Sequence, residues 1–228
     1  MTVKTVIILQ ARMNSSRLPG KILLKLNGLT VLEHIIERLK TFRGADELIV
    51  ATTDTAKDDI TSEIAQNAGA GIFRGSENNV LERYYFCARE CNADQIIRTT
   101  ADDPLTNIEL LEMMFDSHCK KAADYTCTEG FPVGVQEEIV TFDALSKCYK
   151  FSNKDNHFEH VLEFIPENPE LFQINVLHAE GKLRRPDVRV TLDTGKDFDI
   201  IKKYYNHFAD TKRLSIGDII DFWDLQNE

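Results

Sequence analysis

Residues 12–21 collect the side chains of this sequence that are best suited to hold a polyanion. The segment carries two arginines, a lysine, two adjacent serine hydroxyls and a glycine, and it follows a β-branched run, 3–8, with the composition of a buried strand. In a loop after a strand, backbone N–H groups and cationic side chains can converge on phosphate oxygens. A basic surface loop is the alternative, but so many cations in one loop favour a binding site.

The spacing of this loop differs from both common phosphate-binding loops. Ser15 and Ile22 occupy the positions at which a Walker A loop needs a glycine and a serine or threonine. The G-x-G-x-x-G fingerprint of dinucleotide-binding proteins is also absent. The loop therefore predicts phosphate binding by another arrangement of cations and N–H groups.

Two aspartates at expected strand ends are candidate ligands for Mg²⁺. Asp102 lies with Asp103 after one expected strand and before Pro104, which fixes the direction of the chain. Asp193 closes a second expected strand, 188–192. Because Mg²⁺ binds one or two carboxylates together with phosphate oxygens, Asp102 and Asp193 suit a metal site beside the basic loop. The alternative for each aspartate is a turn or a helix cap.

Composition argues against several classes of protein. The 228 residues are 43% hydrophobic and 28% charged, which fits one large globular domain. The net charge of −10 argues against a nucleic-acid-binding surface. Five cysteines without a C-x-x-C pair indicate neither a disulfide framework nor a zinc site. Since the sequence has no signal peptide and no run of 18 apolar residues, we expect a cytoplasmic protein that binds neither nucleic acid nor membrane.

The first half of the chain alternates strand and helix patterns. The apolar spacing predicts strands at 3–9, 47–52, 71–74 and 95–99, and helices at 31–39, 58–68, 79–91 and 108–118. Such alternation predicts an α/β fold with a mixed, mainly parallel sheet flanked by helices. Ligands of such sheets bind beyond the carboxyl ends of the strands, so the polar clusters at 12–21, 52–54 and 99–103 should meet there.

After residue 124 the strict alternation stops. The spacing predicts strands at 125–128, 138–142, 171–178 and 188–192, and helices at 143–151, 153–165, 197–208 and 216–225. Asp143 and Ser215 are expected to cap the first turns of two of these helices. We therefore predict a single domain, 1–228, in which 124–187 is an insertion that covers the site, forms a dimer contact or does both.

Three motifs in this sequence resemble a known family. Ala-Arg-x-x-Ser-Ser-Arg-Leu-Pro-Gly-Lys at 11–21, Ala-Asp-Asp-Pro at 101–104 and Leu-Asp-Thr at 192–194 resemble the cytidylyltransferases that make CMP-activated sugar acids, the CMP-Kdo and CMP-acylneuraminate synthetases. The runs at 73–76 and 79–83 are similar to the SpsF-like branch, which acts in spore coat polysaccharide biosynthesis. The resemblance spans nearly the whole chain.

The resemblance implies a nucleotide-diphospho-sugar transferase fold, which is Rossmann-like, and a specific reaction. A sugar hydroxyl attacks the α-phosphorus of CTP and pyrophosphate leaves. Arg17 and Lys21 would be catalytic, because cations that hold the triphosphate offset the charge that develops on the leaving group. Asp102 and Asp193 would hold Mg²⁺. The resemblance also implies that the 124–187 insertion builds the acceptor pocket and the contact of a homodimer, and that the product is a precursor of surface polysaccharides.

Further site residues are carried over from the same motifs. The resemblance implies nucleotide-binding roles for Ala11, Arg12, Ser16, Arg17, Lys21, Arg74 and Thr100. It implies acceptor-binding roles for Glu138, Glu159 and His160.

The sequence departs from the family at positions that bear on the acceptor. Gln136 and Phe158 stand where the branch has an aspartate and an arginine, and Ala101 stands where the family commonly has glycine. Two alternatives therefore stay open. One is a nucleotidylyltransferase with another base specificity that acts on a sugar 1-phosphate or a molybdopterin-type acceptor. The other is a nucleotide-binding homologue without catalytic activity.

Overall fold

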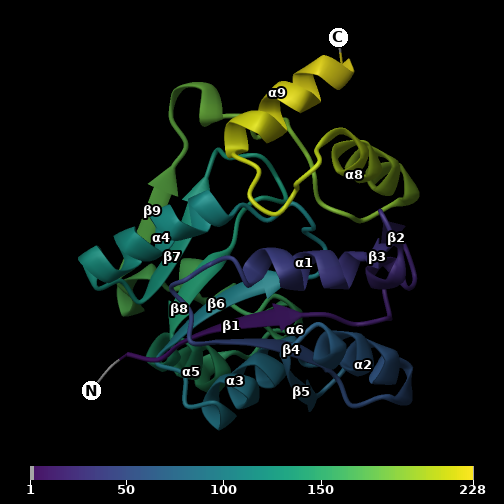
Figure 1. Ribbon diagram of the computed structural model, residues 1–228. Coiled ribbons are helices and arrows are strands. Elements are labelled where there is room, and N and C mark those ends of the chain that lie inside the picture. Colours follow the sequence, from purple (N-terminus) through teal and green to yellow (C-terminus); the bar gives the residue numbers. More distant parts are fainter. Residues whose placement is uncertain (1–2, 228) are drawn as a thin grey trace.

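The computed structural model describes residues 3–227, and a sheet of seven strands forms its centre (Figure 1). The strands of this sheet are β1 (Thr5–Gln10), β4 (Glu47–Thr53), β5 (Gly71–Gly75), β6 (Gln95–Thr100), β7 (Tyr125–Glu129), β8 (Glu138–Thr141) and β9 (Ile174–His178). Their order is β5-β4-β1-β6-β8-β7-β9, and β8 runs antiparallel to both of its neighbours. The predicted class, a mixed and mainly parallel sheet flanked by helices, is confirmed.

Helices cover both faces of this sheet. They are α1 (Val31–Leu39), α2 (Asp59–Asn67), α3 (Val80–Glu90), α4 (Ile108–Lys121), α5 (Phe142–Phe151), α6 (Asp155–Glu159), α7 (Phe164–Glu167), α8 (Gly195–His207) and α9 (Ile216–Asn227). Helices α1 and α3 lie on opposite sides of β1 (Figure 1). Within residues 3–227, every helix is too short or too polar to cross a lipid bilayer. A small hairpin of β2 (Lys25–Leu26) and β3 (Leu29–Thr30) precedes α1.

The core is divided by the sheet into two apolar layers. Along β1, Ile7 and Leu9 join the layer of α1 and α4, whereas Val6 and Ile8 join the layer of α3 and α5. Successive strand residues point to opposite faces, so a strand that is buried on both faces must be apolar throughout. The continuous β-branched run of the sequence reflects this double burial.

Side-chain caps fix where several helices begin. Thr30 accepts a hydrogen bond from the N–H of Glu33, and the Glu33 carboxylate accepts one from the N–H of Thr30, which gives α1 a full capping box. The predicted cap at Ser215 is confirmed, since its hydroxyl accepts from the N–H of Asp218 at 3.0 Å. The predicted cap at Asp143 is wrong, because Thr141 caps α5 instead.

The predicted helix over 153–165 is two short helices, α6 and α7, with a turn between them. This turn brings the buried His157 ring to Glu167, with Nε2 3.1 Å from Oε2. In one continuous helix, residues ten positions apart would be about 15 Å apart along the axis, so the pair requires the break. Pro166 also lacks the N–H that an uninterrupted helix would use.

The predicted strand over 188–192 is extended and buried but does not join the sheet. It makes one isolated bridge, between Arg189 and Val133, and the N–H of Leu192 donates to the carbonyl of Asp102 at 2.6 Å. The apolar side chains of this segment are buried, as their alternation predicted. The segment pairs with a loop, however, and not with a strand. This contact places residue 193 beside the end of β6.

The register of β1 and β6 brings two loops together at one edge of the sheet. Gln10 pairs with Thr100, and the N–H of Ala101 donates to the carbonyl of Gln10 at 2.9 Å. Residues that follow these strands therefore leave the sheet side by side, as expected for the carboxyl ends of parallel strands.

A glycine holds the 188–193 segment close to the sheet, and its substitution gives a test of the packing. Gly134 has a φ of +96°, and an added Cβ would lie 2.5 Å from the backbone nitrogen of Thr191. Gly28 has a similar φ of +93° with nothing within 4 Å, so Gly28→Ala tests backbone strain alone. We expect Gly134→Ala to lower the free energy of unfolding by about 1–3 kcal/mol more than Gly28→Ala does, measured by urea denaturation. Equal losses would contradict this packing.

Candidate active site

The Lys21 ammonium lies at the meeting point of three chain segments. Lys21 is the first residue of a short 3₁₀ helix, Lys21–Leu23. Gly20, which precedes it, has a φ of 71° and turns the loop. Its side chain is only 7% exposed. The Nζ atom donates to the carbonyl of Leu192 at 2.7 Å and lies 3.1 Å from Oδ2 of Asp102 and 3.4 Å from Oδ1 of Asp193. The basic loop and both candidate metal ligands are therefore in direct contact.

Asp193 is surrounded by three cations. Its Oδ1 contacts Arg17 Nη2 at 3.0 Å in addition to Lys21, and its Oδ2 contacts Arg189 Nη2 at 2.6 Å. Sequence reasoning missed Arg189. The signal was present, because residues 189 and 193 share one face of an extended segment. Asp102 differs from Asp193 in that its side chain is 44% exposed toward the cavity described next.

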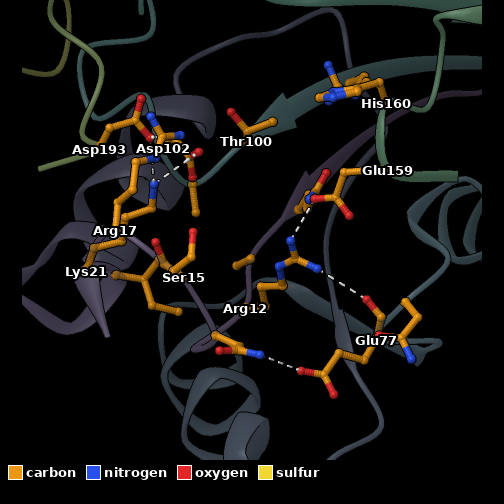
Figure 2. Close-up of a pocket in the computed structure, with 18 residues that line it drawn as sticks. Arg12, Ser15, Arg17, Lys21, Glu77, Thr100, Asp102, Glu159, His160 and Asp193 are labelled. Carbon is orange, nitrogen blue, oxygen red and sulfur yellow. Dashed lines mark hydrogen bonds and ion pairs between the residues drawn. The ribbon is translucent and has the colours of Figure 1, made fainter. Parts of the chain in front are cut away.

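A cavity of about 430 Å³ opens at this edge of the sheet (Figure 2). Its volume lies in the range of small-molecule sites. Ten of the predicted site residues line it: Ala11, Arg12, Ser16, Arg17, Lys21, Thr100, Asp102, Glu159, His160 and Asp193. Figure 2 shows Arg17, Lys21, Asp102 and Asp193 gathered at one end, and Arg12 at the other.

At the second end of the cavity, Arg12 contacts two neighbouring segments of the chain. Arg12 Nη2 lies 2.7 Å from Oε1 of Glu159, and Nη1 donates to the carbonyl of Glu77 at 3.2 Å (Figure 2). Glu159 ends α6, so this ion pair ties the 155–160 segment to the loop after β1. The segment that the sequence assigned to an insertion thus forms part of the cavity wall.

Arg74 does not line this cavity. Its guanidinium donates to the carbonyls of Thr53 and Thr55 and pairs with Asp59 at 2.6 Å, on the β5 side of the sheet. Because all three guanidinium nitrogens of Arg74 bind these groups, the side chain holds the segment after β4 in place. The nucleotide-binding role expected from the motif is therefore not supported by its placement.

Glu138 lies in a second cavity, of about 370 Å³, which shares Arg98 and Thr100 with the first. Glu138 faces Arg98 directly in the pairing of β6 with β8, and their side chains form an ion pair. The Tyr125 hydroxyl donates to the other Glu138 oxygen. The second cavity therefore continues from the first toward β7 and β8.

Two more carboxyl groups, absent from the expected site, face this second cavity. Burial, together with the charge of Asp102, raises the pKa of Asp103 to about 6. Burial also raises the pKa of Glu137 well above its ordinary value, although the Thr106 hydroxyl donates to it at 2.7 Å. Both groups thus hold a proton more readily than exposed carboxyl groups do.

Asp102 and Asp193 can hold Mg²⁺ only if a bound nucleotide also supplies phosphate oxygens as ligands of the ion. Among residues 3–227, no group of three or more His, Cys, Asp or Glu side chains is arranged to hold a metal. Mg²⁺ bound with a nucleotide needs only one or two carboxylates, because phosphate and water oxygens complete its octahedron. Asp102 and Asp193 can supply those carboxylates, with Asp102 the more open to the cavity.

Comparison with known proteins supports the motif assignment. The sequence matches the cytidylyltransferase family over residues 6–218. It is 40% identical to an uncharacterized protein of Methanocaldococcus jannaschii over 97% of this chain and 91% of that protein. It is 33% identical to the spore coat polysaccharide biosynthesis protein SpsF of Bacillus subtilis over 93% of this chain and 91% of that protein.

A solved structure agrees with these matches. A cytidylyltransferase from Leptospira borgpetersenii superposes with a TM-score of 0.92 at 31% identity, covering 99% of this chain and 96% of that one. The family match spans nearly all of the described sheet, including the loop after β1 and both aspartates that contact Lys21. The chain therefore belongs to the cytidylyltransferase family.

Proposed function

We propose that this protein transfers CMP from CTP to a hydroxyl group of a sugar acid or a related polyol and releases pyrophosphate. The observation that carries the proposal is the contact of Lys21 with both Asp102 and Asp193 at one end of the cavity. The SpsF relative supports a role in surface polysaccharide biosynthesis. A homodimer, expected from the family resemblance, and a cytoplasmic location, expected from the sequence composition, remain predictions.

The residues around Lys21 suit electrostatic catalysis. In the proposed reaction the acceptor oxygen bonds to the α-phosphorus, the bond to the pyrophosphate oxygen breaks, and the hydroxyl proton is released. Arg17 and Lys21 would bind the triphosphate and offset the charge that grows on the pyrophosphate. Bound Mg²⁺ would neutralise and orient the phosphates. Asp102 and Asp193 would hold that ion.

The placement of the two cavities supports separate nucleotide and acceptor sites. The first cavity, where we place the nucleotide, is lined by Arg12 and Ser16 from the loop after β1 and by Thr100 at the end of β6. The second is lined by Glu138 and shares Arg98 with the first, so an acceptor there would lie next to the nucleotide. His160 lines the first cavity and also a smaller one beside Arg98 and Glu138, where it would contact the acceptor. Glu159 pairs with Arg12 at the nucleotide end, so its placement does not support the expected contact with the acceptor.

Substitution of Asp102 tests the metal site. We expect Asp102→Asn to lower the rate of pyrophosphate release by about 10²–10³-fold, because a neutral amide holds Mg²⁺ poorly and charge stabilisation of this kind contributes that much to catalysis. Asp143→Asn, at an exposed position in the first turn of α5, is the matched control and should retain the full rate. Circular dichroism verifies that both variants are folded. A folded Asp102→Asn protein with an unchanged rate would refute the metal assignment.

Two arginine variants compare the triphosphate site with the β5 side of the sheet. Arg17→Ala should weaken CTP binding roughly tenfold, as expected for the loss of a charge-assisted hydrogen bond to phosphate. Arg74→Ala should leave CTP affinity within about twofold, since its partners lie outside the cavity. Isothermal titration calorimetry measures both. A large loss with Arg74→Ala alone would reverse these assignments.

Nucleotide selectivity separates the cytidylyltransferase proposal from its alternatives. With Mg²⁺ present, we expect CTP to raise the thermal midpoint more than ATP, GTP or UTP does, since a ligand at about 100 times its Kd adds roughly 2.7 kcal/mol of stability. Stabilisation by UTP or GTP alone would favour another base specificity. CTP binding without pyrophosphate release on any acceptor would indicate a non-catalytic homologue.

A further inference from the structure

The two carboxylate oxygens of Asp193 have different surroundings. Oδ1 lies 3.0 Å from Arg17 Nη2 and 3.4 Å from Lys21 Nζ, and both of these cations line the first cavity (Figure 2). Oδ2 lies 2.6 Å from Nη2 of Arg189, which lies outside the set of described residues that line that cavity. Oδ1 is therefore the oxygen that Asp193 presents to a ligand in the cavity.

The backbone of residue 193 is held by hydrogen bonds on both sides. The N–H of Leu192 donates to the carbonyl of Asp102 at 2.6 Å, and the N–H of Asp193 donates to Oδ2 of Asp197 at 3.0 Å. With the backbone held, rotation of the carboxylate about its last torsion is a freedom that remains, because this torsion has a broad energy profile. Arg189 opposes that rotation, since it donates a charge-assisted hydrogen bond to Oδ2.

Arg189 is itself anchored by the chain around it. Val133 forms hydrogen bonds of 2.8 Å with the residues on both sides of Arg189. The Arg189 Nε atom also lies 3.9 Å from Oδ1 of Asp197, in the first turn of α8. The Arg189 side chain is 42% exposed, and an ion pair with so exposed a partner contributes little to the stability of a fold. We therefore look for its effect in the direction of the Asp193 carboxylate.

We propose that Arg189 is a positioning residue for the metal site, which holds Oδ2 of Asp193 away from the cavity and directs Oδ1 into it. The inference rests on the proposed function, because it takes Asp193 as a ligand of Mg²⁺. Without Arg189 the carboxylate can turn and pair with Arg17 and Lys21 through both oxygens, which leaves it less available to the metal. Removal of a group that orients a metal ligand typically lowers metal affinity by about 10–100-fold.

Arg189→Gln tests this inference through the effect of Mg²⁺ on the binding of CTP. Calorimetry measures CTP affinity without any acceptor, once with Mg²⁺ and once with EDTA in its place. We expect the factor by which Mg²⁺ strengthens CTP binding to fall about tenfold in Arg189→Gln. The affinity for metal-free CTP should change by less than about threefold, because an exposed charge outside the cavity is screened by salt. An unchanged Mg²⁺ factor in the folded variant would overturn the inference.

The conservative variant and a matched control sharpen the test. Arg189→Lys keeps the charge but lacks the fork of the guanidinium, so the Mg²⁺ factor should lie between those of the wild type and Arg189→Gln. If Arg189→Gln does not fold, a loss of at least about threefold in Arg189→Lys carries the test, and no loss contradicts the inference. Arg213→Gln removes an arginine that pairs with Glu112 at the same distance, 2.6 Å, outside the cavity, and should keep the wild-type factor.

Other roles for Arg189 give different results. Direct contact of Arg189 with phosphate would lower CTP affinity equally with Mg²⁺ and with EDTA, and that result would overturn the inference. A purely structural role would lower the thermal midpoint of Arg189→Gln and leave the Mg²⁺ factor unchanged, which would overturn it as well.

The same measurements separate this inference from the proposed function. If the wild-type protein does not bind CTP, or binds it equally well with Mg²⁺ and with EDTA, the proposed function or its metal site is wrong and the inference falls with it. If Mg²⁺ strengthens CTP binding to the wild type and to Arg189→Gln by the same factor, the positioning role alone is wrong.

Discussion

The site depends on one buried ammonium group, that of Lys21. A charge removed from water destabilises a fold unless partners compensate it, and here the partners come from segments far apart in the sequence. The Leu192 carbonyl and the carboxylates of Asp102 and Asp193 all lie within 3.4 Å of Nζ. The loop after β1, the end of β6 and the 188–193 segment must therefore be in place together. A ligand that entered here would meet charges whose positions the fold already fixes.

Charge is divided between the two cavities. Cations concentrate where we place the triphosphate, with Arg17, Lys21 and Arg189 all contacting Asp193. Carboxyl groups concentrate in the second cavity, and Arg98 stands where the two cavities meet. The net charge of the chain is −10, so its composition alone does not explain a cluster of cations. The separation of cations from carboxyl groups is a local feature of this edge of the sheet. The cations at the Lys21 end favour a polyanion there.

Much of this arrangement could be predicted from the sequence, because parallel strands bring their carboxyl ends to one edge. That rule alone places the basic loop beside Asp102. The rest depended on tertiary contacts. Arg74 turns to Asp59 rather than the cavity, and the 188–192 segment pairs with a loop, although local spacing predicted a strand. The break between α6 and α7 follows from the contact of His157 with Glu167, which no periodicity encodes.

A crystal structure with CTP and Mg²⁺ would test the central claim most directly. We expect the triphosphate to contact Lys21 and Arg17, with Asp102 and Asp193 holding the metal. The cytosine base would then lie toward Arg12 and Thr100. Triphosphate bound elsewhere, with Lys21 still held by the two aspartates and no metal between them, would contradict the account.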